Sequence, residues 1–318
     1  MWEGDFLLPF LSYGVILVFT EFFKKLSIKQ KQAVWGYVFL IVPLLFYIGV
    51  RFYPTFNSFY ISLTDWDIVS ANKNFIGLAN YRELFSDKVF WKTLGNTLEY
   101  VIYGLPINLF LSFVIAYNIN KLTKGVSIYR TLYFIPYLTS LVAVSWVWRW
   151  LYQPVPMGFI NNMLSQAGNA QQPFLNSTTQ ALPSILAPTI WVQMGFQIII
   201  FLAGLKGIPQ YLYEAADIDG ASNMQKLFNI TIPLLRPTII FLVVTGSIRY
   251  LRIFTQVYNM TYQGEGGPLN STKPLVLYIY NSAFRRFEMG YAAAMTVVLF
   301  AIIFIITLFQ LKVLNKND

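Results

Sequence analysis

The chain has no cysteine and no histidine among its 318 residues. Without cysteine it can form no disulfide and offers no thiolate. Without histidine it lacks the commonest metal ligand and a general base suited to neutral pH. These absences leave few candidates for catalysis. We therefore expect a protein that is not an enzyme and that has no metal site and no cofactor of its own.

Charge is also scarce. Charged residues make up 12% of the chain, whereas soluble domains carry about 25%. Hydrophobic residues make up 56%, and the mean hydropathy is +0.52. Many of the abundant aromatic residues stand at the ends of apolar runs, where their rings favour the bilayer interface. This composition indicates a membrane protein.

The formal net charge of +9 suggests nucleic-acid binding in a soluble protein. Here no basic stripe with interleaved exposed aromatics accompanies it. The alternative is that lysine and arginine gather in cytoplasmic loops and set the orientation of the membrane helices. We adopt this second interpretation and expect a lipid bilayer, and no nucleic acid, as partner.

A spanning helix needs about 20 mostly apolar residues to cross roughly 30 Å of hydrocarbon. Six runs meet this need, and a weaker run at 6–23, FLLPFLSYGVILVFTEFF, precedes them. The sequence therefore predicts an all-α polytopic membrane protein, with six spanning helices and an extra N-terminal helix. The six runs are approximately 33–53, 95–119, 131–151, 184–205, 237–259 and 289–311.

The run at 6–23 lacks the preceding basic segment and the small-residue cleavage site of a signal peptide. It either spans the membrane or lies in the interface. Lysines follow it at 24, 25, 29 and 31, which places Met1 outside. We expect residues 1–32 to form this helix with a basic cytoplasmic linker, and residues 33–318 to form one transmembrane domain.

The later loops agree with this orientation. The loop at 121–130 and the C-terminal tail are basic, and the loop at 206–236 carries Lys206, Lys226 and Arg236, whereas the loop at 152–183 carries no charge. The long segment 54–94 is mixed in charge and falls outside. The positive-inside rule therefore places loop 206–236 in the cytoplasm.

This cytoplasmic loop contains EAADIDGASNMQKLFNITIPLLRP at 214–237. Pro209 suits the first turn of a helix over YLYEAADID, which Gly220 ends or bends. Ser222 can cap a second short helix, MQKLFN. On these residues alone, the loop is either a surface hairpin that joins two spans or a docking element, because its exposed apolar residues favour burial against a partner.

The pattern E-A-A, three residues, G, then I-x-I-P resembles the EAA loop of binding-protein-dependent ABC importers, and more narrowly their maltose-type carbohydrate permease subunits. Ile232 replaces the usual leucine before the proline, and an aromatic residue often found near Met224 is absent. The matching positions are Glu214, Ala215, Ala216, Asp219, Gly220, Ala221, Phe228, Ile230 and Pro233.

Three further segments resemble this family in the right order, so the resemblance covers about 35–315. They are NFIGLANYRELF at 74–85, WVWRWLYQPVPMGFINNML at 146–164 and MTYQGEGGPLNSTKPLVLYIYNSAF at 260–284. The run at 6–23 is not part of the common six-span core.

The resemblance implies a permease subunit that imports a sugar or oligosaccharide. It would have the six-helix core of an ABC importer type I permease and lie in the inner (cytoplasmic) membrane of a bacterium or archaeon. It would pair with a second homologous permease, two ATPase subunits that bind ATP and Mg, and an extracytoplasmic solute-binding protein. This chain has no phosphate-binding G-x-x-x-x-G-K-[ST] motif of its own. The resemblance assigns ATPase coupling to Glu214, Ala215, Ala216, Asp219, Gly220, Phe228 and Pro233.

A sugar site needs aromatic faces and hydrogen-bonding side chains. Trp191 and Gln193 in one predicted span, and Tyr258 and Asn259 in the next, are candidates for the substrate pathway. For each, helix packing or interface anchoring is the alternative.

Arg249 and Arg252 fall near the middle of the predicted span 237–259, three residues apart on one helix face. An arginine there should face protein or a wet cavity, because its insertion costs about 2.5–3.5 kcal/mol. We hypothesise that the pair lines the pathway and favours an acidic saccharide or a sugar phosphate. The alternative is that the pair bonds to an acid or carbonyl of a partner helix.

An ion-coupled secondary transporter is the main rival function, and a polytopic membrane enzyme is the third. A secondary transporter typically has intramembrane carboxylates, but few are seen here: Glu99 lies near a span end. Dependence on ATP would separate the importer from both rivals.

Overall fold

The computed structural model describes residues 27–69 and 73–314. These residues are largely helical, and pairing of extended segments among them is limited to isolated bridges, Thr64 with Phe75 and Asp67 with Glu288. Four of their helices are long and apolar enough to cross a membrane, or six when each of two bent helix pairs is one span. The predicted all-α membrane fold is confirmed. The predicted run at 6–23 lies outside the described residues.

The described residues form two compact units, divided between Tyr60 and Ile61. The first is helical from α2 (Ile28–Tyr47) through the π-helical turn η1 (Ile48–Phe52) to α3 (Tyr53–Ile61). Ser27 starts α2 with a capping box, in which it exchanges hydrogen bonds with Gln30. The predicted span 33–53 lies within this continuous helix. The domain division at residue 33 stays a prediction.

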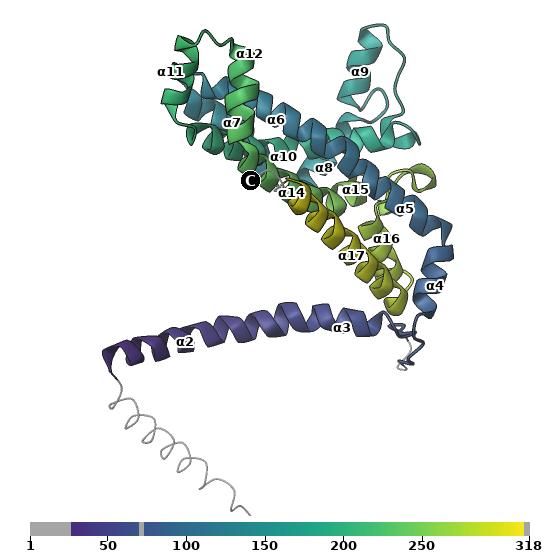
Figure 1. Cartoon of the computed structure of the whole chain (residues 1–318). Coiled ribbons are helices and arrows are strands. Elements are labelled where there is room, and N and C mark those ends of the chain that lie inside the picture. Colours follow the sequence, from purple (N-terminus) through teal and green to yellow (C-terminus); the bar gives the residue numbers. More distant parts are fainter. Residues whose placement is uncertain (1–26, 70–72, 315–318) are drawn as a thin grey trace, which may run out of the picture. The chain divides into compact units, whose positions relative to one another are not determined.

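The second unit contains the remaining helices (Figure 1). In chain order they are α4 (Ala79–Ser86), α5 (Lys88–Glu99), η2 (Tyr100–Gly104), α6 (Leu105–Asn120), α7 (Val126–Leu138), α8 (Leu141–Leu151), α9 (Phe159–Gln166), η3 (Phe174–Asn176), α10 (Ala181–Lys206), α11 (Gln210–Ile218), α12 (Asn223–Lys226), η4 (Leu227–Thr231), α13 (Ile232–Leu234), α14 (Arg236–Leu251), α15 (Thr255–Met260), η5 (Tyr262–Gly264), η6 (Pro268–Asn270), α16 (Leu275–Phe284) and α17 (Met289–Leu314).

Helix α10 is the buried centre of this unit and packs on α6 and α7. Glycines allow its close approaches. A Cβ at Gly195 would lie 2.3 Å from the carbonyl oxygen of Tyr133 in α7, and a Cβ at Gly204 would lie 2.5 Å from Oγ1 of Thr238 in α14. Close packing of this kind holds helices in a bilayer, where lipid tails are as apolar as leucine.

Two of the predicted spans are broken. The span predicted at 131–151 is divided into α7 and α8, which are bent by 92°. The continuous helix predicted over 237–259 is wrong, because α14 ends at Leu251 and α15 begins at Thr255. Arg249 therefore lies in the last turn of α14, and Arg252 caps its C-terminal end. The two arginines do not share a mid-helix face as the sequence predicts.

The segment after α15 is fixed to α5 by side chains that bond its backbone. The amide of Asn96 donates to the carbonyl oxygens of Asn270 (2.6 Å) and Lys273 (2.9 Å). The hydroxyl of Tyr100 donates to the carbonyl of Thr272 at 3.0 Å. The GGP loop, which contains Gly266, Gly267 and Pro268, is thereby held against a membrane helix.

Candidate functional site

A cavity of about 440 Å³ lies where the two broken spans meet α10. We call it the arginine cavity. It contains both arginines singled out in the sequence, together with Gln193. Its lining residues are Tyr137, Leu141, Val192, Gln193, Arg249, Arg252, Ile253, Phe254, Thr255 and Gln256. Non-helical backbone at membrane depth is tolerated where it lines such a cavity.

A hydrogen bond from a neighbouring helix holds the side chain of Gln193 in place. Its Oε1 accepts a hydrogen bond of 3.4 Å from Nδ2 of Asn108 in α6, which also donates to the Tyr250 hydroxyl at 3.2 Å. The hydroxyl of Ser112 donates to Oδ1 of Asn108 at 3.2 Å. Gln193 is only 5% exposed, and its amide nitrogen has no hydrogen-bond partner among the described residues. This N–H group can therefore donate to a ligand in the cavity that Gln193 lines.

A second buried amide lines the same cavity. Gln256 in α15 is 7% exposed, and within residues 27–69 and 73–314 its side chain has no hydrogen-bond partner. One turn along α10 from Gln193, the Oε1 of Gln197 is buried and unpaired. Gln197 lines a small adjoining space with Gln193 and Arg249. Unpaired amides with access to a cavity suit a ligand that carries hydroxyl groups.

Arg249 lies against aromatic rings. Its guanidinium is 5.6 Å from the ring centre of Tyr137 and 5.4 Å from that of Phe196, and these two rings stack at 5.5 Å. Such contacts stabilise a cation without consuming a hydrogen bond. Neither Arg249 nor Arg252 forms an ion pair with an acid of the described part of the chain.

The other predicted pathway residues lie outside the arginine cavity. Trp191 is 41% exposed, and its ring centre is 6.1 Å from that of Trp148. Tyr258 stacks on Phe254 at 5.3 Å. The carbonyl of Asn259 accepts a hydrogen bond of 3.2 Å from Arg149 of α8. The structure thus unites Gln193, Arg249 and Arg252, and separates Trp191, Tyr258 and Asn259 from them.

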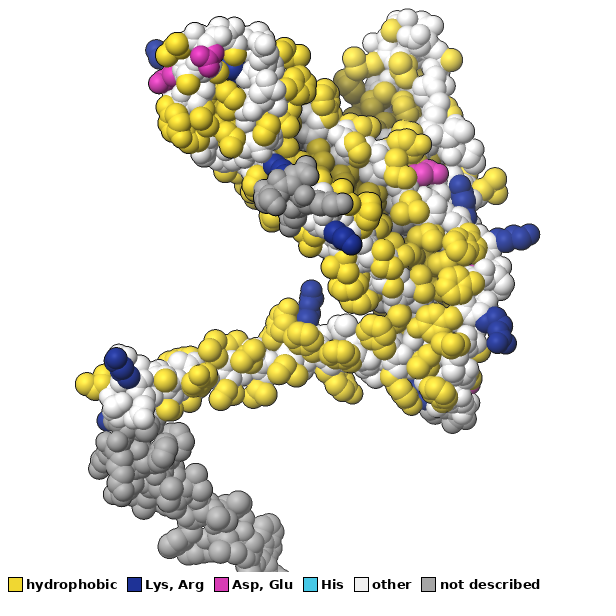
Figure 2. Space-filling model, in the orientation of Figure 1, with side chains coloured by type: hydrophobic (Ala, Val, Ile, Leu, Met, Phe, Trp, Pro, Cys, Tyr) yellow, Lys and Arg dark blue, Asp and Glu magenta, His cyan; other side chains and the backbone are white. Residues whose placement is uncertain are grey.

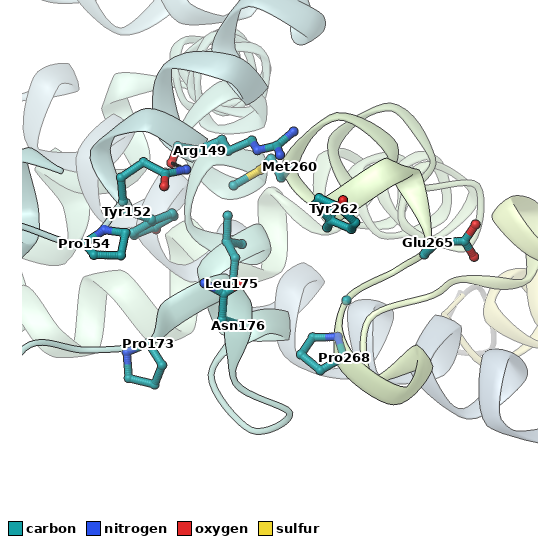
Figure 3. Close-up of a pocket in the computed structure, with 12 residues that line it drawn as sticks. Arg149, Tyr152, Pro154, Pro173, Leu175, Asn176, Met260, Tyr262, Glu265 and Pro268 are labelled. Carbon is teal, nitrogen blue, oxygen red and sulfur yellow. Dashed lines mark hydrogen bonds between the residues drawn. The ribbon is translucent and has the colours of Figure 1, made fainter. Parts of the chain in front are cut away.

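A second cavity, of about 450 Å³, lies beyond the C-terminal end of α15 (Figure 3). We call it the tyrosine cavity, after Tyr152 and Tyr262. In Figure 3 the Glu265 carboxylate points away from the other labelled side chains. It is engaged by Lys273 at 3.5 Å and by Arg285. The lining residues are Arg149, Tyr152, Gln153, Pro154, Pro173, Leu175, Asn176, Met260, Tyr262, Glu265, Gly267 and Pro268.

Helices α11 and α12 form a two-helix loop at one end of the second unit (Figure 1). The predicted cap is present, because Ser222 accepts from the Gln225 backbone at 3.3 Å and Gln225 Oε1 accepts from the Ser222 backbone at 2.7 Å. Gly220 has a φ of +72° and makes the turn. Pro209 is the N-cap, one residue earlier than expected. Lys226 and Asp217 join the two helices through an ion pair at 2.6 Å.

Most of the predicted coupling residues are exposed on this loop. Acidic side chains are visible at this end of the unit in Figure 2, whereas hydrophobic side chains cover much of the face beyond it. Ala216 is half-buried, and the exposed members are Glu214, Ala215, Asp219, Gly220, Phe228 and Pro233. Large apolar side chains are exposed beside them, at Tyr211, Ile218, Met224 and Phe228. The loop thus offers an amphipathic surface of the kind that partners cover.

Sequence reasoning missed Asn108, Tyr137 and Gln256. Asn108 and Gln256 are amides within apolar runs, so their polarity could have identified them. Tyr137 resembles the many other aromatic residues of the chain, and only the packing of α7 on α10, where Tyr137 stacks on Phe196, shows that it lies beside Arg249.

Residues 85–316 match the family model described as "Binding-protein-dependent transport system inner membrane component". The chain is 37% identical to the probable ABC transporter permease protein YesP of Bacillus subtilis, over 91% of this chain and 93% of YesP. It is 32% identical to the multiple sugar-binding transport system permease protein MsmF of Streptococcus mutans, over 91% and 98%. It is also 32% identical to the arabinooligosaccharides transport system permease protein AraP of Bacillus subtilis, over 87% of each chain.

The fold is similar to that in the crystal structure of a bacterial ABC transporter involved in the import of the acidic polysaccharide alginate. The TM-score is 0.78 at 24% identity, over 91% of this chain and 97% of the other. The structure of a bacterial alginate ABC transporter in complex with an alginate pentasaccharide-bound periplasmic protein gives a TM-score of 0.76 at 24% identity, over 89% and 96%. At this identity the similarity establishes the fold.

Proposed function

Since this chain belongs to the family of binding-protein-dependent transport system inner membrane components, we propose that it is the permease subunit of an ATP-driven importer of a sugar or oligosaccharide. It is a multi-pass membrane protein with a transport role and not an enzyme. Relatives named for sugars and arabinooligosaccharides support a saccharide substrate. The observation that carries the proposal is the family match over 85–316.

The arginine cavity is the part of the pathway that this subunit contributes. Gln193 and Gln256 present amides to hydroxyl groups, and Arg249 and Arg252 present guanidinium groups. None of the lining residues is a carboxylate that could bind and release a coupling proton or sodium ion. This arrangement favours the importer over the ion-coupled transporter.

Energy comes from two ATPase subunits, which bind ATP and Mg. They dock on the loop between α10 and α14, with contacts from Glu214, Ala215, Ala216, Asp219, Gly220, Phe228 and Pro233. The exposed apolar side chains beside these residues support a docking role. The location is the cytoplasmic membrane of a bacterium or archaeon, with the docking loop on the cytoplasmic side.

Helix α14 connects the docking loop to the arginine cavity. The segment Asn223–Leu234 meets α14 at a bend of 64°, and the opposite end of α14 carries Arg249. A helix of this length spans about 24 Å. Movement of the ATPases would therefore reach the cavity through a rigid element and alternate its access between the two sides. A second permease completes the pathway, and an external binding protein delivers the substrate.

The test is to purify the tagged chain from solubilised native membranes and identify its partners by mass spectrometry. We expect a second permease and an ATPase, and we expect Glu214→Lys to lose the ATPase while retaining the second permease. A matched control is Glu83→Lys, which reverses an exposed charge on α4. Recovery of the chain alone, without ATPase activity, would contradict the proposal.

A further inference from the structure

The arginine cavity has an unbalanced charge. Its lining includes two guanidinium groups and no carboxylate. The ion pairs found in the described part of the chain all use other bases, namely Lys226, Lys273, Arg285 and Arg286. Arginines within a membrane domain are costly, and they usually pair or line a polar path. An anion from outside the chain would complete this cavity.

The donor groups of the two arginines are free for such an anion. Arg249 touches the rings of Tyr137 and Phe196, which leave its N–H groups available. The Arg252 side chain, at the end of α14, has no hydrogen-bond partner in residues 27–69 and 73–314. A guanidinium binds an oxyanion through two parallel N–H groups, which a neutral hydroxyl cannot match.

The cavity also offers groups for the uncharged part of a sugar. Gln193 and Gln256 are more than nine-tenths buried, and the amide nitrogen of Gln193 and the side-chain amide of Gln256 have no hydrogen-bond partner among the described residues. Gln193 is fixed by Asn108, so its amide is oriented before a ligand arrives. Buried amides beside two guanidinium groups match a molecule that carries both hydroxyls and an oxyanion.

The tyrosine cavity provides a contrast. It contains Arg149 and Glu265, and Arg149 already donates to the carbonyl of Asn259. Its lining therefore has one guanidinium group and one carboxylate, whereas the lining of the arginine cavity has two guanidinium groups and no carboxylate. Selection by charge is expected in the arginine cavity and not at the tyrosine cavity.

We propose that the transported saccharide is anionic, and that Arg249 and Arg252 bind its oxyanion in the arginine cavity. This inference rests on the proposed saccharide importer and names its substrate class. The oxyanion is the carboxylate of a uronic acid or the phosphate of a sugar phosphate, which share the chemistry that a guanidinium recognises.

The first test measures binding to the complete wild-type importer without its binding protein, so that the permease cavity alone selects. Equilibrium dialysis uses labelled digalacturonate, its carboxyl-reduced counterpart digalactose, and glucose 6-phosphate. Digalacturonate or glucose 6-phosphate should bind at least about tenfold more tightly than digalactose. The preferred member of the two identifies the carboxylate or the phosphate source. Equal or tighter binding of digalactose would overturn the proposal.

The second test measures ATP-dependent uptake of the same probes into proteoliposomes with the binding protein present. Arg249→Gln and Arg252→Gln should each lower uptake of the anionic probe about tenfold, the effect of losing a charge-assisted hydrogen bond. The ratio of anionic-probe uptake to digalactose uptake should therefore fall in both variants, which reports the loss of selection by charge. Arg249→Lys keeps the positive charge but lacks the planar pair of N–H donors. Its uptake of the anionic probe should be intermediate between that of the wild type and that of Arg249→Gln. Arg82→Gln, which removes an exposed arginine of α4, is the matched control.

The outcomes separate the two proposals. ATP-dependent uptake that is unaffected by both glutamine variants would overturn the anionic assignment and leave the importer in place. Absence of ATP-dependent uptake for every saccharide probe would contradict the importer itself. If a variant fails to assemble, the binding preference of the wild-type importer decides.

Discussion

The amide of Asn108 donates a hydrogen bond to the hydroxyl of Tyr250 at 3.2 Å, although the two residues are 142 positions apart. Both side chains are fully buried. The same Asn108 amide reaches Gln193, so one side chain ties α6, α10 and α14 together. This polar cluster lies beside the arginine cavity and fixes the position of one of its lining amides.

Asn108→Leu should weaken substrate binding and lower stability. It leaves the Tyr250 hydroxyl without its donor and frees Gln193, at a cost of about 1–3 kcal/mol for buried unpaired groups. We expect a KM several-fold higher in reconstituted uptake, with a lower Tm. Asn118→Leu is the control on the same helix, because Asn118 is exposed and bonds only the carbonyl of Val114. Equal effects of the two variants would contradict this role.

Gly104→Ala should destabilise the membrane domain. A Cβ at this position would lie 2.4 Å from Cε1 of Tyr250, and overpacking of this kind typically costs about 1–3 kcal/mol. Gly95→Ala in α5 meets nothing within 4 Å, so it should be neutral or stabilising by about 0.5–1 kcal/mol. Thermal unfolding of the purified protein in detergent compares the two. A Gly104→Ala protein as stable as wild type would show that Tyr250 can move aside.

The carboxylate of Asp87 should make the stability of the folded protein depend on pH in the acidic range. Burial raises its pKa, but the hydroxyls of Tyr278 and Tyr291 and the backbone N–H groups of Val89 and Phe90 lower it, with the net effect that the pKa lies below its ordinary value. Tyr278 donates at 2.5 Å and Tyr291 at 2.8 Å. Because the folded-state pKa is depressed, this contribution is fully present above about pH 5 and is lost as the pH falls through the folded-state pKa.

The measurement is Tm against pH for wild type and Asp87→Asn. The Tm difference should be constant between about pH 5 and pH 8 and should shrink below about pH 4. Asp65→Asn is not a suitable control, because hydrogen bonds from Asn74 also lower the pKa of Asp65. Glu83→Gln is preferable, since Glu83 is exposed on α4. A Tm difference that does not change with pH would contradict the role assigned to the ionised Asp87.

Gly220→Val should uncouple the permease from its ATPases. Its φ of +72° costs a β-branched residue about 1–2 kcal/mol, so the turn between α11 and α12 should distort. Asparagine tolerates this conformation, and Gly220→Asn is therefore the control. We expect Gly220→Val to reduce co-purification of the ATPase while Gly220→Asn retains it. Loss of the ATPase in both variants, or in neither, would show that turn geometry does not matter.

Much of the docking loop could be predicted because local chemistry determines it. Residues close together in the sequence determine a helix over 210–218, a glycine turn and a serine cap. The structure contains all three. The long apolar helices α10 and α17 can also be predicted from the sequence, because the hydropathy of their residues alone indicates where they lie.

The helix breaks could not be predicted in the same way. No glycine or proline lies at Arg252–Phe254, so the end of α14 depends on how α15 packs against α8. Pro136 lies three residues before the bend at Thr139 and gave only an indirect signal. Because the break between α14 and α15 is not visible in the sequence, the sequence predicts Tyr258 and Asn259 as pathway residues. In the structure Gln256, on the same short helix, lines the cavity instead.

The most direct test of the central claim is saccharide uptake into proteoliposomes that contain this chain with its co-purified partners and binding protein. We predict that uptake requires ATP on the side of the membrane where the ATPases are bound. We also predict that the Glu214→Lys variant shows no ATP-dependent uptake. Uptake that proceeds without ATP and follows an imposed proton or sodium gradient would contradict the account.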